Sequence, residues 1–346
     1  MRPARIIAIA AVALVVLGAP AAYTAYWFAL GGQVERGIQR WEADRRAEGY
    51  VIKHGPMRRG GFPFALSFTI PGPEIARPDP PLAWRAETLT VSAKPWALQD
   101  VSFRFPGRHE LAGPVDGKPR LIDAAIGDGR LDMLFDGRGR ALAAQLDLKQ
   151  VEAKFADTGE LFRIAAARSV MRRRAMTAVT DVSLETDTKI AGLVLPAAQA
   201  GPLGPEIAAI NALANVIGQA PENGTREAAA RWRDAGGYIE LKEAQLVWNR
   251  VDIRGTGTAR LDATLQPDIR LDGRVRGVDT LIDALVATGQ MRVPESILAK
   301  GVLAGLSRPA DDGGPPVLRV PISVREGNRV YLGPVRVGRM QPLVWR

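Results

Sequence analysis

Two patterns of hydrophobic and polar residues divide this chain of 346 residues. Residues 6–30 contain no charged side chain. From Tyr50 onward, apolar and polar residues alternate with a period of two through much of the chain. Successive side chains of a strand point to opposite faces, so this period predicts antiparallel strands with one apolar face and one solvated face. The pattern therefore predicts an N-terminal apolar helix followed by a β-rich body.

The charge-free run of residues 6–30 is long enough to cross a membrane. A helix of this length, at about 1.5 Å per residue, extends about 37 Å, whereas the hydrocarbon core of a bilayer is about 30 Å thick. Aromatic rings with a polar edge favour the membrane–water interface. Four aromatic residues, three of them with a polar edge, gather near the end of the run: Tyr23, Tyr26, Trp27 and Phe28. We therefore predict an uncleaved transmembrane anchor over residues 1–32.

Two alternatives to an anchor stay open. Ala19-Pro20-Ala21-Ala22 supplies small residues after an apolar region, as in a cleaved signal peptide, and a buried soluble helix is the other alternative. Arg2 and Arg5 favour a cytoplasmic N-terminus, but the arginines within residues 36–46 compete with them. Long domains are translocated largely regardless of charge, so we expect the body to be exported.

Alternating segments predict the strands. The clearest are residues 65–70, 89–91, 101–105 and 142–148, with further strands near 180–195. The same pattern covers residues 239–241, 246–248, 251–253, 259–265 and 269–275, and residues 317–332 hold two strands before the closing segment 332–338. We expect Gly255-Thr256-Gly257 and Gln266-Pro267-Asp268 to be the turns of a three-stranded meander.

Spacings of three and four residues predict the helices. After a joint at Gly31-Gly32, residues 33–48 form an amphipathic helix that Gly49 ends. One face of this helix is expected to carry Val34, Gly37, Ile38, Trp41 and Arg45. Further helices are expected over residues 205–218, 225–234, 279–289 and 295–306, and Thr225 caps the second of these.

These elements predict an α+β fold: mostly antiparallel, curved β-sheet with a few packed helices, preceded by one N-terminal transmembrane helix. Residues 1–32 form the anchor or signal segment. Residues 33–200 form a first β-rich part with an N-terminal helix. Residues 201–346 add helices and a C-terminal β-meander that is continuous with the first part.

Composition narrows the possible functions. The chain has no cysteine, which excludes disulfides, thiolate zinc sites and cysteine nucleophiles. Its formal net charge is +9, but aromatic residues make up only 6% and basic residues lie beside acidic ones. The densest basic run, Arg172-Arg173-Arg174, is typical of an exposed strand or turn, or of contact with anionic head groups. We therefore predict no nucleic-acid partner.

Catalytic and metal-binding motifs are missing from the sequence. It has no nucleophile elbow, no phosphate-binding loop and no HExxH zinc motif. The two histidines, His54 and His109, have no clustered carboxylate or second histidine nearby in sequence, so we expect surface or structural roles. Asp311-Asp312 is typical of a solvated turn, and weak cation binding is its alternative. We predict no catalytic, cofactor-binding or metal-binding residue, no cofactor, and a protein that is not an enzyme.

One local segment is distinctive. Gly60-Gly61-Phe62-Pro63-Phe64 combines two glycines and a proline, which fix an unusual backbone, with two phenylalanines that can anchor it. We interpret it as a turn that pins the first strand. The alternative is a lip that faces a ligand.

The sequence resembles an uncharacterised bacterial family, domain of unknown function 2125. The residues that carry the resemblance follow the N-terminal apolar run: Trp41, Gly60-Gly61-Phe62-Pro63-Phe64, Leu193-Val194-Leu195-Pro196, Gly236-Gly237-Tyr238, Trp248 and Tyr331-Leu332-Gly333-Pro334. The C-terminal strand pattern also looks like that of the broader AsmA-like envelope proteins. This resemblance implies a β-rich body anchored to the inner membrane and located in the periplasm, and it supplies no catalytic residues.

Together these observations favour a non-enzymatic envelope protein. A sheet that is apolar on one side and incompletely covered is suited to holding an acyl chain or helping phospholipid transfer along a groove. The expected partners are the inner membrane, and lipid or other envelope proteins. The alternative is a structural or assembly factor that acts through envelope protein partners.

Overall fold

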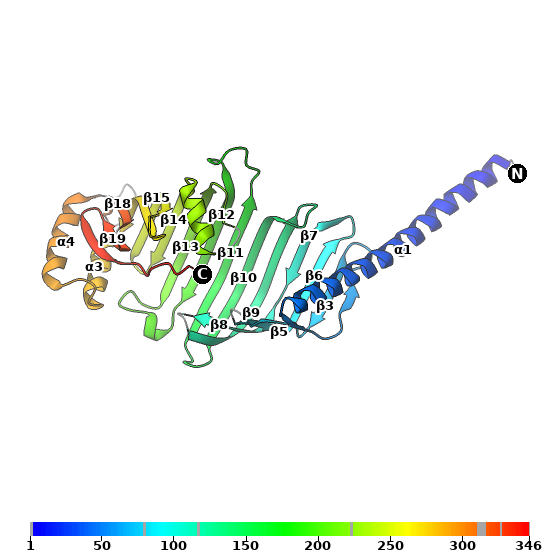
Figure 1. Cartoon of the computed structure of the whole chain (residues 1–346), viewed down its shortest axis with the longest axis horizontal. Coiled ribbons are helices and arrows are strands. Elements are labelled where there is room, and N and C mark those ends of the chain that lie inside the picture. Colours follow the sequence, from blue (N-terminus) through cyan, green and yellow to red (C-terminus); the bar gives the residue numbers. More distant parts are fainter. Residues whose placement is uncertain are drawn as a thin grey trace. The chain divides into compact units, whose positions relative to one another are not determined.

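The computed structural model describes residues 3–78, 81–115, 118–221, 224–309, 316–325 and 327–345. The chain divides into two compact units, Met1–Gly139 and Arg140–Arg346, which are described separately here. Strands dominate both units, and all of the strand pairs identified in the described residues are antiparallel. The prediction of a mostly antiparallel β fold with a few helices is confirmed (Figure 1).

The first unit begins with a long helix, α1, from Pro3 to Ala47. The predicted joint at Gly31-Gly32 is wrong, because α1 continues through both glycines. Gly31 is a contact point instead: a Cβ atom there would lie 2.8 Å from the guanidinium of Arg59. The predicted end of the helix is confirmed, and Gly49 adopts φ of +88° just beyond it. Among the residues whose side chains the structure describes, which in α1 begin at Ala21, no helix is both long and apolar enough to cross a bilayer.

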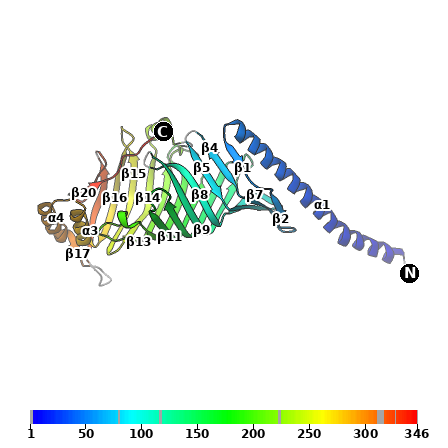
Figure 2. The same ribbon diagram turned by 90° about the horizontal axis from the view of Figure 1, so that it is seen from below.

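The first unit has nine strands in one antiparallel sheet. Their bounds are β1 Val51–Lys53, β2 Arg58–Gly60, β3 Leu66–Pro71, β4 Glu74–Arg77, β5 Leu82–Ala86, β6 Thr88–Lys94, β7 Ala97–Arg104, β8 Gly107–Val115 and β9 Lys118–Phe135. The long strand β9 forms one ribbon of this sheet, and the other strands lie end to end in pairs that form four more ribbons: β8 with β7, β5 with β6, β4 with β3, and β1 with β2. β7 and β8 pair with successive parts of β9, β5 and β6 pair with β8 and β7, and β4 and β3 pair with β5 and β6. β1 and β2 complete the row beside β4 and β3 (Figure 2).

The breaks between successive strands of the first unit lie side by side in the sheet. The sheet therefore bends along the line that these breaks form. Gly72 and Pro73 separate β3 from β4, and Glu87 alone separates β5 from β6. The backbone bonds continue across the bend, because Gly72 N donates to Glu87 O at 2.9 Å and Glu87 N donates to Arg108 O at 2.9 Å. The ribbons are therefore kinked without losing their pairing.

The second unit is an antiparallel meander with three helices. Its strands are β10 Ala141–Phe155, β11 Leu161–Arg173, β12 Val182–Val194, β13 Glu206–Ile217, β14 Tyr238–Trp248, β15 Val251–Leu261, β16 Pro267–Arg276, β17 Ser307–Arg308, β18 Val317–Arg325, β19 Arg329–Leu332 and β20 Val335–Arg339. β10 to β16 pair in chain order, followed by β18, β19 and β20, and the short β17 also pairs with β18. A 3₁₀ turn covers Ala197–Gln199.

Three predicted helices of the second unit are confirmed. They are α2 Arg226–Asp234, α3 Val278–Ala287 and α4 Val293–Leu306. Thr225 caps α2 as predicted, since its hydroxyl accepts a hydrogen bond of 3.3 Å from the Ala228 N–H. Helices α3 and α4 lie beside the strands that end the meander (Figure 1) and build its main core.

The predicted helix over residues 205–218 is wrong, because these residues form strand β13. Apolar residues at Ile207 and Ile210 have the spacing of a helix, but a register shift between Ile207 and Ala209 produces the same spacing in a strand. The extra residue of the bulge returns Ile210 to the face that Ile207 occupies. Long neighbouring strands on both sides then outweigh the local helical pattern.

The predicted turn at Gly255-Thr256-Gly257 is also wrong, since β15 runs through it. The register of β14 against β15 shifts between Leu241 and Ala244, opposite this segment. A Cβ atom at Gly257 would lie 2.1 Å from the carbonyl oxygen of Arg270 on β16. The glycine permits close approach of two backbones within the sheet and does not end a strand.

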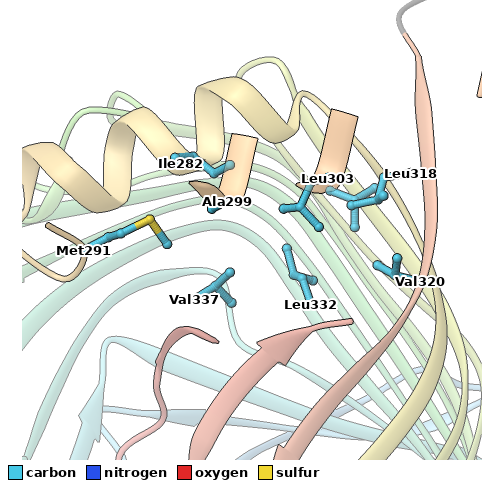
Figure 3. Packing of buried hydrophobic residues seen from close by; sticks show 9 residues of the cluster. Ile282, Met291, Ala299, Leu303, Leu318, Val320, Leu332 and Val337 are labelled. Atoms are coloured by element: carbon cyan, nitrogen blue, oxygen red, sulfur yellow. The ribbon is translucent and has the colours of Figure 1, made fainter. Parts of the chain in front are cut away.

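The core of the second unit lies between α3, α4 and the last strands. Figure 3 shows Leu303 of α4 directed toward Leu318, Val320 and Leu332. Val275, Ile282 and Leu318 are fully excluded from solvent. Burying such side chains contributes about 1.5–3 kcal/mol each, so this end of the sheet is anchored by its own helices.

Candidate functional site

Helix α1 docks on the distinctive glycine–proline segment of the first unit. Trp27, which is 3% exposed, packs with Leu66 and Phe68 of β3. Its indole Nε1 donates a hydrogen bond of 2.9 Å to the carbonyl oxygen of Ala65, and the hydroxyl of Tyr23 donates to the carbonyl oxygen of Pro63. The segment therefore holds the helix as well as the strand that follows it.

The geometry of the glycine–proline segment explains its composition. Gly61 has φ of +92°, and a Cβ atom there would lie 2.7 Å from the carbonyl oxygen of Ala65. The Ala65 N–H donates back to Gly61 O at 2.8 Å, which closes the turn. Phe62 contacts the helix, with its ring centroid 5.5 Å from that of Trp27 in an edge-on arrangement. The structural interpretation of this segment as a pinning turn is thus supported.

Five aromatic side chains surround this docking point and remain exposed to solvent. They are Tyr26, Phe28, Phe62, Phe64 and Trp96, which we call the aromatic cluster; their exposed fractions are 48%, 56%, 50%, 75% and 64%. Tyr26 OH donates to the carbonyl oxygen of Pro95 at 2.9 Å, which places the β6–β7 turn with Trp96 beside the helix. Rings of this size are normally buried, so their exposure together makes the cluster a candidate interaction surface.

Polar contacts fix the second half of α1 against the first strands. Glu42 is only 7% exposed. Its two carboxylate oxygens lie 2.8 Å from His54 Nε2 and 3.1 Å from Arg46 Nη2. Arg59 Nη2 donates to Glu35 Oε2 at 2.7 Å. His54 therefore has a carboxylate partner, which the sequence did not predict because Glu42 lies twelve residues earlier on the helix. Trp41, which the spacing places on one face with Val34 and Ile38, is 48% exposed.

His109 has a structural position at the bend of the first unit. It is 3% exposed, and its ring is stacked on Trp84 with centroids 6.1 Å apart. Trp84 Nε1 donates to His109 Nδ1 at 3.3 Å, and His109 Nε2 lies 2.9 Å from the carbonyl oxygen of Phe105. Both ring nitrogens are therefore engaged within the fold, as the predicted structural role requires.

The second unit carries a continuous apolar face across eight strands. Residues in register across β10–β16 and β18 form rows on this face. One row is Leu148, Ala167, Ile190, Ile210, Leu246, Ile253, Val275 and Leu318. A second row is Ala144, Met171, Thr186, Ala214, Leu241, Gly257, Leu271 and Ile322. In the strands that the structure describes between β10 and β19, Arg173 at the end of β11 is the one charged residue whose register places it on this face.

The opposite face of the same strands is charged. Its row adjacent to the apolar residues is Asp147, Arg168, Lys189, Asn211, Gln245, Arg254, Arg274 and Arg319. Ion pairs connect neighbours on this side, such as Arg254 with Asp252 at 3.0 Å and Arg163 with Glu152 at 3.1 Å. These exposed pairs contribute little stability each. They identify the solvated side of the sheet.

Helices cover only one end of the apolar face. Val275 and Leu318 are fully buried under α3 and α4. On β10–β14, most residues of the apolar face are half-buried. Among the described residues of this part of the face, only Val151, Ile207 and Ala214 are less than 10% exposed. The apolar surface on these strands is therefore left largely uncovered by the packing of the unit's own helices.

The predicted candidates for chemistry do not assemble into a site. Gly255-Thr256-Gly257 lies within β15, and Arg172 and Arg173 end β11. Asp311-Asp312 lies outside the described residues. In the described parts of the chain, no group of three or more histidine, aspartate or glutamate side chains is arranged to hold a metal ion.

Sequence reasoning missed the exposure of Phe64 and Trp96. The available signal was their position: both are aromatic residues in tight turns next to proline, where neighbouring strands cannot cover them. It also missed Glu42, because a buried carboxylate on a helix has no signature in the local pattern.

The chain matches a known family over most of its length. The profile of a family described as "Uncharacterized protein conserved in bacteria (DUF2125)" matches residues 27–341. No curated protein and no solved structure matches the chain. The match covers both units and all of the strands.

Proposed function

The chain belongs to this uncharacterised bacterial family, and within it we propose a non-enzymatic envelope protein that binds phospholipid acyl chains on the apolar face of the second unit. Residues 1–32 anchor it in the inner membrane by one span, with the body in the periplasm. The observation that carries the proposal is the apolar face itself, which crosses eight strands in register and is covered by helices at one end only. We further propose, from its C-terminal strand pattern, that the protein is related to AsmA-like envelope proteins.

The chemistry of the apolar face suits an acyl chain better than a polar ligand. Its rows present aliphatic side chains with small residues and a few hydroxyls between them, such as Ala212, Thr188 and Ser169. Each methylene that moves from water to such a surface contributes about 0.8 kcal/mol. A charged headgroup gains nothing from the rows themselves, so it would stay at the edge of the sheet, in contact with water.

The aromatic cluster supports membrane anchoring. It surrounds α1 at Tyr26 and Phe28, where the charge-free run of residues 6–30 ends. Phe64 and Trp96 come from turns of the body, so both the helix and the body present aromatic rings at the same level. Tyr and Trp rings, with apolar bodies and polar edges, concentrate at the membrane–water interface, and Phe rings insert among the acyl chains below it. The cluster would therefore seat the first unit against the headgroups.

Purification of the full-length protein in mild detergent, followed by native mass spectrometry, tests lipid binding. Two adjacent alanines provide matched variants: Ala144 lies on the apolar face opposite Met171, and Ala143 lies on the charged face opposite Arg172. We expect bound phospholipid on the wild-type protein and on Ala143→Glu, and its loss from Ala144→Glu. Equal lipid content in both variants, or none on the wild type, would overturn the proposal. A stoichiometric protein complex without lipid would favour an assembly factor instead.

Protease accessibility tests the topology. In spheroplasts, an added protease should digest the body of the full-length protein while the N-terminus stays protected, and alkaline extraction should leave the protein with the membranes. A body that is protected in intact spheroplasts contradicts periplasmic exposure. Release by alkaline extraction, together with a shortened N-terminus, would instead indicate a cleaved signal peptide.

A further inference from the structure

Helix α4 exposes an unusually apolar outer surface. Val293, Ile297 and Leu298 are 60%, 68% and 71% exposed, and Val302 and Leu306 are 46% and 45% exposed. The helix packs on the sheet only through its other side. The residues on that side are Ser296, Ala299 and Leu303. A helix at the edge of a soluble domain normally turns charged residues outward, and α4 does the reverse.

The charged residues of α4 are held away from this surface. The carboxylate of Glu295 accepts a hydrogen bond of 3.0 Å from the Arg292 N–H at the start of the helix. Lys300 Nζ donates to Asp283 Oδ1 on α3 at 2.6 Å. On the helix wheel, both residues lie at the borders of the outer face. Gly301 and Gly305 lie on the outer face between these two borders. A Cβ atom at either glycine would have no atom within 4 Å, so the face is open there.

Basic residues stand at both ends of the outer face. Arg292 comes immediately before α4 and Arg308 follows it closely, and both are exposed. An apolar surface with arginine at its ends matches an anionic bilayer, where acyl chains accept the apolar face and phosphates accept the guanidinium groups. Pairing of α4 with α4 of a second copy would instead bring arginines together, Arg292 against Arg292 in a parallel pair and Arg292 against Arg308 in an antiparallel pair.

We propose that α4 docks in the plane of an anionic phospholipid bilayer through Val293, Ile297, Leu298 and Val302, with Arg292 and Arg308 on phosphates. This contact is additional to the anchor of residues 1–32 and does not depend on lipid binding by the apolar face of the sheet. It gives the second unit its own membrane contact. The charge-free character of the face then reflects its environment, as in other interfacial helices.

The absence of cysteine from the chain allows a direct test. The full-length protein is prepared as Leu298→Cys and, as a matched control on the charged face of the sheet, as Glu243→Cys. Each variant carries an environment-sensitive fluorophore and is reconstituted with vesicles of phosphatidylcholine and phosphatidylglycerol that contain doxyl-labelled lipid. We expect the label at position 298 to shift its emission to shorter wavelength and to be quenched by the doxyl group, and the label at position 243 to do neither.

Two outcomes would overturn the proposal. The first is an aqueous emission spectrum for the label at position 298 in anionic vesicles. The second is efficient disulfide cross-linking of Gly301→Cys between two copies without quenching at position 298, which would assign the face to self-association. Replacement of phosphatidylglycerol by phosphatidylcholine should weaken the shift, because the arginines lose their anionic partners. Bound phospholipid by native mass spectrometry is a separate readout, so failure here leaves the proposed function of the sheet to its own test.

Discussion

The indole Nε1 of Trp27 on α1 donates a hydrogen bond of 2.9 Å to the carbonyl oxygen of Ala65, at the end of the glycine–proline segment. The two residues are separated by 38 positions in the sequence. Trp27 is 3% exposed and packs with Leu66 and Phe68 in a cluster that also contains Leu30 of α1, so it joins the helix to strand β3. This contact holds α1 against the strands of the first unit.

Replacement of Trp27 should undock α1. Trp27→Ala removes a buried aromatic ring, which costs about 3–5 kcal/mol, and Trp27→Phe removes chiefly the hydrogen bond to Ala65 O, at about 1 kcal/mol. Hydrogen exchange of the Leu66 and Phe68 amides should accelerate in the order wild type, Phe, Ala. Trp41→Ala is the control, because Trp41 is 48% exposed. Equal exchange in the Trp27→Ala and Trp41→Ala variants would contradict this role of Trp27.

Gly61→Ala should destabilise the first unit more than Gly49→Ala. Both glycines have positive φ, +92° and +88°, so each substitution has a similar backbone cost of about 1 kcal/mol. Only at Gly61 does the new Cβ also meet an atom, the Ala65 carbonyl oxygen at 2.7 Å; at Gly49 nothing lies within 4 Å. Chemical denaturation of the two variants measures the difference. A loss at Gly49 as large as that at Gly61 would show that backbone conformation alone is responsible.

Glu42→Gln should weaken the contact between α1 and the first strands. The carboxylate of Glu42 is engaged by His54 and Arg46, and hydrogen bonds to charged groups contribute about 1.5–3 kcal/mol. Glu48→Gln is the matched control, because its ion pair with Arg45 is half exposed and contributes at most about 0.5 kcal/mol. The free energy of unfolding in urea should fall clearly for the first variant only. A comparable fall for both would indicate a general effect of charge.

Asp262→Ala should destabilise the turn between β15 and β16. The Asp262 carboxylate accepts hydrogen bonds from Thr264 N at 2.8 Å and Gln266 N at 2.9 Å, so we expect a loss of about 1–3 kcal/mol in the free energy of unfolding. Burial raises the pKa of Asp262, but hydrogen bonds from Gln266 and Thr264 outweigh it and lower the pKa below its ordinary value.

This lowered pKa sets a pH dependence. The contribution of Asp262 to stability is fully present above the unfolded-state pKa of about 3.9 and is lost as the pH falls through the lower pKa of the folded state. The difference in free energy of unfolding between wild type and Asp262→Ala should therefore shrink in acid. A difference that stays constant from neutral pH down to about pH 2, well below that unfolded-state value, would contradict the assigned hydrogen bonds.

The period-two pattern was sufficient to predict the character of the fold. In β10, for example, Leu142, Ala144, Leu146 and Leu148 alternate with polar neighbours and lie on one face as expected. Thr225 and the apolar spacing of residues 279–306 were likewise sufficient for α2, α3 and α4. These features depend on neighbours within a few positions of the chain, which is the range over which side-chain direction and capping act.

The pattern of apolar and polar residues could not predict bulges or contacts between distant segments. Ile207 and Ile210 have helical spacing in sequence, yet a register shift places both on the apolar face of a strand. The local sequence predicts a turn at Gly257. In the structure, this glycine instead allows the carbonyl oxygen of Arg270 on β16 to lie close to the backbone of β15. In both cases the neighbouring strands supply the hydrogen bonds and packing that decide the conformation.

By itself, the sequence determined that one face of the strands is apolar, that residues 6–30 carry no charge, and that no familiar catalytic motif is present. Only the tertiary structure decided which apolar residues stay exposed. Leu303 and Leu298 are both apolar residues of α4, but Leu303 is 1% exposed and Leu298 is 71% exposed. Burial depends on which elements meet across the fold, and that is set by the summed packing of distant segments, which no local pattern contains.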